Sequence, residues 1–267
     1  MKSVKPSVAL FAITVGSGLM MESSSLMPFG LGLSLFIPAL FIYTYTNSGL
    51  GITLLSSLIA ILTILLFNKD AVIDTTSILL LGPTFLISKR TGPSAAVLGG
   101  ALLLTLFTAL QEAIMGLPPE VKKEFAELSN YRYSIYFLSS TIYSTFAYGA
   151  VNWVVKELPP VTEIRFGFWS VILFTLSAIA TLTGSGELKT VAINLLVVSI
   201  SILTVQGISV FLWFFQKFST TWKLITGLTI FIFPPIFFLT ALIIGMLDQK
   251  FNFRKLKGGK EDGSNPS

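Results

Sequence analysis

The chain has 267 residues, of which 53% are hydrophobic and only 12% charged, and its mean hydropathy is +0.80. A water-soluble fold needs far more polar surface, so the composition predicts a membrane protein. The absence of cysteine and histidine excludes disulfides, thiolate and imidazole catalysis and the usual zinc, haem and iron–sulfur ligands. The 18 Lys and Arg residues exceed the 13 Asp and Glu residues, but they lie beside helix ends and in the tail, which favours anionic lipid over nucleic acid as the partner.

Apolar stretches follow one another from Ser7 to Leu247, and nearly all of them are free of charge. A bilayer core about 30 Å thick needs about 20 apolar residues per helix. We therefore predict an all-α, polytopic transmembrane bundle over residues 1–247, with eight or nine spans because the first is short and the fourth carries Asp74. The last span contains Pro234–Pro235, which predicts that the span kinks or unwinds there. The candidate spans are 7–21, 29–46, 50–67, 71–88, 94–116, 135–155, 166–183, 190–215 and 223–247.

Two polar interruptions separate groups of spans. In the larger, 117–134, Val121, Phe125 and Leu128 share one helical face among charged residues. This pattern favours an interfacial connector lying on the lipid headgroups over a gate or docking element. The smaller interruption, 156–165, contains two prolines and is interpreted as a tight connector within one domain, not a domain boundary.

Residues 248–267 form a basic tail, and its end, 261–267, is expected to be disordered. The positive-inside rule predicts that the tail is cytoplasmic, while the side of the N-terminus stays open. We expect a bend within residues 249–252, because only a turn of the backbone lets Arg254 pair with Asp248 six positions earlier. The basic residues predicted to bind anionic lipid are Lys250, Arg254, Lys255 and Lys257.

Two carboxylates lie inside predicted spans, where a charge is costly unless it faces a partner or a cavity. Asp74 is one turn into the fourth span, and Glu112 is one turn from the end of the fifth. Either residue is a candidate for being protonated, for pairing with Lys69, Lys89 or Arg90, or for binding a cation or cationic ligand. Simple interfacial placement is the favoured alternative, in which both carboxylates reach water.

Three amides complete the candidate substrate-binding set. Gln206 lies near the middle of the 190–215 span beside Gly207, which permits a close neighbouring helix, and Asn194 lies on roughly the same side. Asn152 lies near the end of the sixth span. These amides predict either hydrogen bonds to a small polar ligand or hydrogen bonds that join helices, with a slight preference for the second. In both cases Gln206 should face the protein interior.

Several segments carry a family resemblance. Residues 245–255 resemble the G-x-x-D-x-x-x-x-[FL]-R-[KR] ending of the YybS-like bacterial membrane family. Residues 206–208 resemble its Q-G-aliphatic element. Residues 165–169 resemble the basic-aromatic entry into the helix that precedes this element. The earlier half resembles the family only in hydropathy and in the turns at 68–70 and 89–92. The early helices of this family are similar to the substrate-binding S-components of energy-coupling-factor transporters. The resemblance implies an S-component-like bundle, but no activity.

S-components dock on a transmembrane partner through small residues spaced four apart in their first helix. By this resemblance, Ala9, Ala12 and Gly16 form a candidate docking face. Small residues at this spacing also occur by chance, and Ala95 with Gly99 fits the pattern equally well.

No acid–base pair, activated nucleophile, metal-binding carboxylate cluster or Walker A loop occurs, so we expect neither an enzyme nor a cofactor or metal site. We interpret the chain as a multi-pass protein of the bacterial cytoplasmic (inner) membrane that captures or helps to transport a small solute with energising partner subunits. The alternative is a non-transporting anchor or regulator of an envelope or translation-linked assembly, held through the tail.

Overall fold

A computed structural model describes residues 4–21, 23, 25–116, 128–222, 225–226 and 232–255. Helices and turns account for these residues, and no strand occurs among them, which confirms the predicted all-α class. The chain divides into two compact units, Met1–Val161 and Thr162–Ser267. This division falls inside the proline-containing segment 156–165, which the sequence analysis had interpreted as a connector within one domain.

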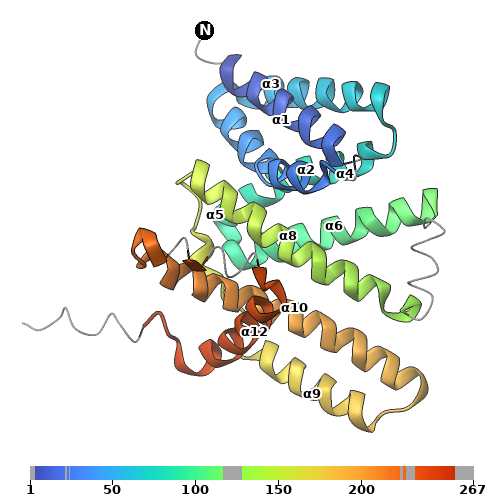
Figure 1. Ribbon diagram of the computed structural model, residues 1–267, viewed down its shortest axis with the longest axis vertical. Coiled ribbons are helices and arrows are strands. Elements are labelled where there is room, and N and C mark those ends of the chain that lie inside the picture. The colour runs from blue at the N-terminus through green and yellow to red at the C-terminus, as the bar shows by residue number, and fades with distance from the viewer. Residues whose placement is uncertain are drawn as a thin grey trace, which may run out of the picture. The chain divides into compact units, whose positions relative to one another are not determined.

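The first unit contains the larger number of helices. Helix α1 packs against α3 and α4, and α6 lies beside α8 (Figure 1). Phe85 of α4 meets Tyr148 of α8 edge to face at 5.2 Å, and both rings are fully buried. The helices are α1 (Val4–Met21), α2 (Met27–Ser34), α3 (Ile37–Phe67), α4 (Ala71–Leu86), α5 (Ser88–Thr91), α6 (Pro93–Met115), the 3₁₀ turn η1 (Ser129–Tyr131) and α8 (Arg132–Val154); the 3₁₀ turn η2 (Val161–Glu163) follows at the division.

Helix α3 covers parts of two predicted spans, 29–46 and 50–67, in one long element. Gly49, inside α3, has φ 82° and ψ 169°, a conformation that a side chain would strain, so the helix is broken there. The break agrees with the predicted boundary between spans 29–46 and 50–67. The first of those spans is itself interrupted, because the chain turns at Leu35–Phe36 between α2 and α3.

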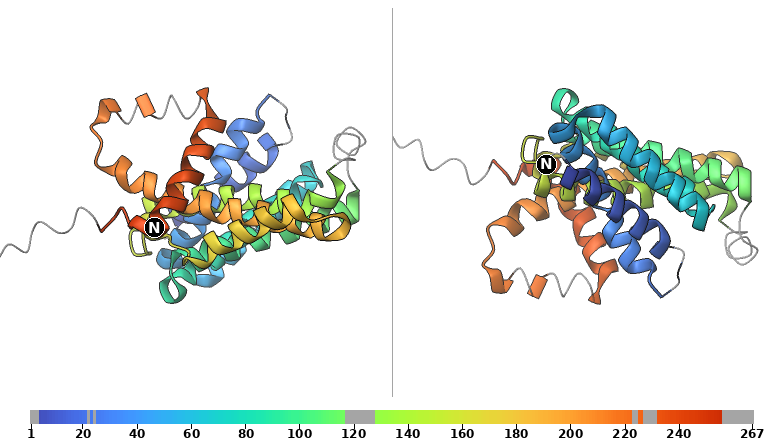
Figure 2. Two further views of the ribbon diagram at one scale, coloured as in Figure 1. Left: turned by 90° about the horizontal axis from the view of Figure 1, so that it is seen from below. Right: turned by 90° about the horizontal axis from the view of Figure 1, so that it is seen from above.

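The second unit consists of α9 (Trp169–Thr183), α10 (Gly186–Gln216) and α12 (Pro234–Phe251). Helix α10 packs against both α9 and α12 (Figure 2). A Cβ atom added to Gly207 of α10 would collide with the carbonyl oxygen of Ala241, and one added to Gly245 of α12 would collide with that of Leu203. The two backbones therefore touch, which confirms that Gly207 permits a close neighbour.

Helix α12 differs from the last predicted span at both ends. It begins at Pro234, where the two prolines occupy first-turn positions that need no backbone donor. Phe233 before them is non-helical, which agrees with the predicted alternative that the span unwinds at the prolines. It continues to Phe251, and Asp248 therefore belongs to the helix and not to the tail. Asn252 ends it in the left-handed region at φ 46°, which confirms the expected bend.

Four helical regions among the described residues are long and apolar enough to cross a membrane: Met27–Phe67, α6, α10 and α12. Helices α1, α4 and α9 are apolar but shorter. Large apolar side chains, such as Leu182 and Leu66, are exposed on these helical regions. Contact of such side chains with lipid tails carries no free-energy penalty, whereas contact with water does. The described helices are thus compatible with a membrane protein, and the count of eight or nine crossings stays a prediction.

Candidate functional site

The side chain of Gln206 is fully buried in the second unit, as predicted. Its Oε1 accepts hydrogen bonds from the backbone N–H of Phe166, at 3.0 Å, and from Nε2 of Gln249, at 2.6 Å. Its Nε2 donates to Oδ2 of Asp248 at 2.9 Å. Because these partners come from α12 and from the segment before α9, the amide joins elements of the fold, which is the structural alternative that the sequence analysis had slightly preferred.

Asp248 and Arg254 form the charged part of the same network. Asp248 is fully buried, accepts the N–H of Phe253 at 3.0 Å, and lies 3.4 Å from Nη2 of Arg254. The guanidinium also donates to the carbonyl oxygens of Thr162, at 2.6 Å, and Ile164, at 3.0 Å. Burial lowers the pKa of Arg254, and the charge of Asp248 opposes that shift.

We call Gln206, Asp248, Gln249 and Arg254 the polar lock. Its charges are paired and hydrogen-bonded, which is the condition under which buried charges are tolerated. Arg254 was predicted to bind lipid, but its side chain is only 12% exposed and donates to the protein's own carbonyl oxygens, which disfavours that role. Lys250 and Lys255 are exposed and remain predicted lipid ligands, whereas Lys257 lies outside the described residues, as do 117–127 of the connector and the tail end 261–267.

The other two amides make local contacts. Nδ2 of Asn194 donates to the carbonyl of Thr190 in its own helix at 3.0 Å. Asn152, in the first unit, donates to the carbonyl of Pro159 at 3.1 Å and accepts the N–H of Val161. The amide of Asn152 therefore holds the chain that follows α8.

Glu112 pairs with a residue that was not among its predicted partners. Its Oε1 lies 2.7 Å from Nη1 of Arg132 at the start of α8, and its Oε2 accepts a hydrogen bond from the Tyr136 hydroxyl at 3.3 Å. Lys89 instead pairs with Glu157 at 3.0 Å. The Glu112–Arg132 pair thus joins the end of α6 to the start of α8.

Replacement of Glu112 by glutamine is expected to lower the free energy of unfolding measurably, because Arg132 then loses its ionic hydrogen bond to a carboxylate that is only 12% exposed. Thermal unfolding in detergent measures the change. Glu157→Gln is the matched control: its pair with Lys89 is largely exposed, so the change should stay below about 0.5 kcal/mol. Equal losses in the two variants would contradict this assignment.

Asp74 is the predicted site residue that borders a pocket. The pocket lies in the first unit, has a volume of about 500 Å³, and is lined by residues of α1, α2, α4, α6 and α8. Its size lies within the usual range for small-molecule sites, roughly 300–1,000 Å³. We call it the Asp74 pocket; it is lined by Met21, Met27, Leu31, Asp74, Ser77, Ile78, Leu104, Thr108, Ser139, Ser140 and Tyr143.

Hydroxyl groups supply most of the remaining polarity of the Asp74 pocket. The hydroxyls of Ser77, Thr108 and Ser139 donate to helix carbonyl oxygens at 2.7, 3.0 and 3.0 Å. The Tyr143 hydroxyl lies 2.6 Å from Oγ of Ser34, and Ser34 in turn donates to Leu31 O at 2.8 Å. Since the Ser34 hydrogen is used in that bond, Tyr143 is the donor to Ser34. Sequence reasoning missed these residues because each hydroxyl is unremarkable in its own helix.

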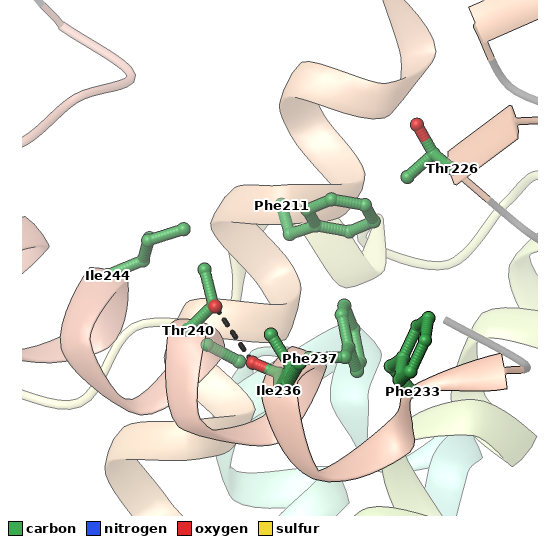
Figure 3. Close-up of a pocket in the computed structure, with 8 residues that line it drawn as sticks. Phe211, Thr226, Phe233, Ile236, Phe237, Thr240 and Ile244 are labelled. Atoms are coloured by element: carbon green, nitrogen blue, oxygen red, sulfur yellow. Dashed lines mark hydrogen bonds between the residues drawn. The ribbon is translucent and has the colours of Figure 1, made fainter. Parts of the chain in front are cut away.

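A second pocket, of about 160 Å³, lies in the second unit and is almost entirely apolar. Figure 3 shows the rings of Phe211, Phe233 and Phe237 around it. The hydroxyl of Thr240 donates to the carbonyl of Ile236 at 2.8 Å, as the dashed line marks. With no charged group among its described lining residues, this pocket offers little to orient a polar solute.

The candidate docking face lies on α1. Ala12 is exposed, Ala9 and Gly16 are half-buried, and a Cβ atom at Gly16 would meet nothing within 4 Å. The face is therefore open within the described structure, and docking stays a prediction. No group of three or more acidic side chains suited to a metal ion occurs in the described part of the chain.

Comparison of the chain with protein-family models, curated proteins and solved structures gave no match. The resemblance to the YybS-like family and to S-components therefore stays a prediction from the sequence.

Proposed function

We propose that this chain is a multi-pass protein of the bacterial cytoplasmic membrane that captures a small solute in the Asp74 pocket and helps to move it across the bilayer. The observation that carries the proposal is the pocket itself, in which five helices surround a volume suited to a small molecule. The exposed apolar helices and the four long apolar regions support the membrane location. An S-component-like bundle of eight or nine spans is part of the same proposal.

Movement of the solute would need partner subunits, because the sequence contains no Walker A loop with which to use ATP. The open face at Ala9, Ala12 and Gly16 is the proposed docking site for a transmembrane energising subunit. Lys250 and Lys255, which are both exposed, are the proposed contacts to anionic lipid on the cytoplasmic side. No chemical step is included, since the proposal is one of binding and transport.

Native mass spectrometry of gently solubilised full-length protein, purified from its own cells, tests this function. We expect the mass of a retained small molecule, together with membrane and ATPase subunits in fixed ratio. Soluble partners that are lost when residues 256–267 are removed, with no retained molecule, would instead support the anchoring alternative.

A further inference from the structure

The chemistry of the Asp74 pocket restricts the class of solute that it can hold. Among its described lining residues, Asp74 alone carries a formal charge. Asp74 lies in the first turn of α4, at the positive end of the helix dipole. A negative charge on the wall of a pocket in an apolar protein favours a cation inside it and disfavours an anion.

Several hydroxyl groups around this charge present acceptors, and Ser140 contributes a further hydroxyl to the lining. Ser77, Thr108 and Ser139 already donate their hydrogens to helix carbonyls, so only the lone pairs of their oxygens remain for a ligand. Tyr143 likewise donates to Ser34. A solute that brings its own N–H donors is matched by this set, whereas a carboxylate or phosphate would face acceptors and a like charge.

The volume and the apolar walls distinguish an organic cation from a bare metal ion. A pocket of about 500 Å³ is far larger than an ion needs, and Met21, Met27 and Ile78 contribute apolar surface to it. A neighbouring pocket of about 350 Å³, lined mostly by apolar residues, shares Leu31, Ser139 and Tyr143 with it. The two pockets thus adjoin at Tyr143, whose ring can also contact a cation.

We propose that the solute is a small organic cation, with an ammonium group bound by Asp74 and the hydroxyl oxygens and an apolar body that extends along Tyr143. This inference rests on the proposed function, because it names the class of solute for the same pocket. Removal of the charge of Asp74 should abolish the preference for the cation while the pocket keeps its shape.

The test uses three probes of similar size on the purified full chain in lipid nanodiscs: 2-phenylethylamine, 2-phenylethanol and 3-phenylpropanoate. Calorimetry at pH 7 should show that the amine binds at least about tenfold more tightly than the other two, as the loss of a charged hydrogen bond implies. Asp74→Asn should weaken amine binding by roughly ten- to a hundredfold. Asp70→Asn, the same change at an exposed residue four positions earlier, should leave the affinity unchanged.

A second variant keeps the test valid if Asp74→Asn does not fold. Thr108→Val removes one acceptor at nearly constant shape and should weaken amine binding about threefold. Equal or tighter binding of the alcohol or the carboxylate would overturn the cation inference and leave a solute site in place. If sodium ions bind in a way that depends on Asp74 and the amine does not bind, the cation inference is also overturned. If none of the probes binds, the inference fails, and the retained molecule in native mass spectrometry still decides the proposed function separately.

Discussion

Replacement of Gly207 by valine is expected to lower the free energy of unfolding by about 3 kcal/mol or more, because the added side chain would collide with the backbone of α12 at Ala241. The two helices would have to separate along their crossing, since the colliding atom is a carbonyl oxygen and not a flexible side chain. Thermal unfolding in detergent or lipid nanodiscs measures the loss.

Gly16→Val is the matched control for this prediction. Gly16 also lies inside an apolar helix, but open space surrounds the position of its missing Cβ atom. Its replacement should change stability by less than about 1 kcal/mol, since valine has the higher helix propensity of the two. Similar losses at Gly16 and Gly207 would show that the α10–α12 contact is not what makes Gly207 necessary.

Gln206→Leu should destabilise the second unit by about 2–4 kcal/mol, because the Phe166 N–H and the carboxylate of Asp248 would each lose a buried partner. Gln216→Leu is the control, since Gln216 lies exposed at the end of the same helix and should change stability by less than about 0.5 kcal/mol. In protein kept folded at low temperature, Gln206→Leu should still retain any bound solute. Loss of the solute with unchanged stability would return Gln206 to the list of ligand-binding residues.

The helices were largely predictable from the sequence, because hydropathy reports burial in lipid residue by residue. A boundary between spans 29–46 and 50–67 and a bend within 249–252 were predicted, and the structure has a helix break at Gly49 and a left-handed Asn252. The interruption of the last span at Pro234 and Pro235 was predicted, but a new helix start at this pair was not. A proline pair is compatible with a kink or with a helix start, and its place depends on where the preceding segment ends.

The partners of the polar residues were much less predictable. The interior position of Gln206 followed from its place in an apolar span, but Asp248 lies 42 residues away in what resembled a basic tail. Glu112 pairs with Arg132, which lies 20 residues later in the sequence. Charge alone could not identify Arg132 as the partner among the basic residues of the chain. Pairings of this kind depend on how helices rotate and cross, which hydropathy does not encode.

The Asp74 pocket shows the same limit. Asp74 was a candidate because a charge in an apolar span is costly unless it faces a partner or a cavity. This argument needs only the residues around Asp74 in the sequence. The pocket also needs hydroxyls from α6 and α8, which no spacing rule connects to α4. The sequence could therefore indicate one residue of the site, while the structure brings the others to it.

Site-directed cysteine labelling tests the central claim, that the Asp74 pocket admits solute while the interior of the second unit does not. The natural chain has no cysteine, so a single introduced thiol gives the whole signal. Ser140 lines the pocket, whereas Ser201 is fully buried in α10, and each is replaced by cysteine in turn. A small cationic methanethiosulfonate should modify Ser140→Cys in folded protein in nanodiscs and leave Ser201→Cys unmodified. Rapid modification of Ser201→Cys with an unreactive Ser140→Cys would contradict the account.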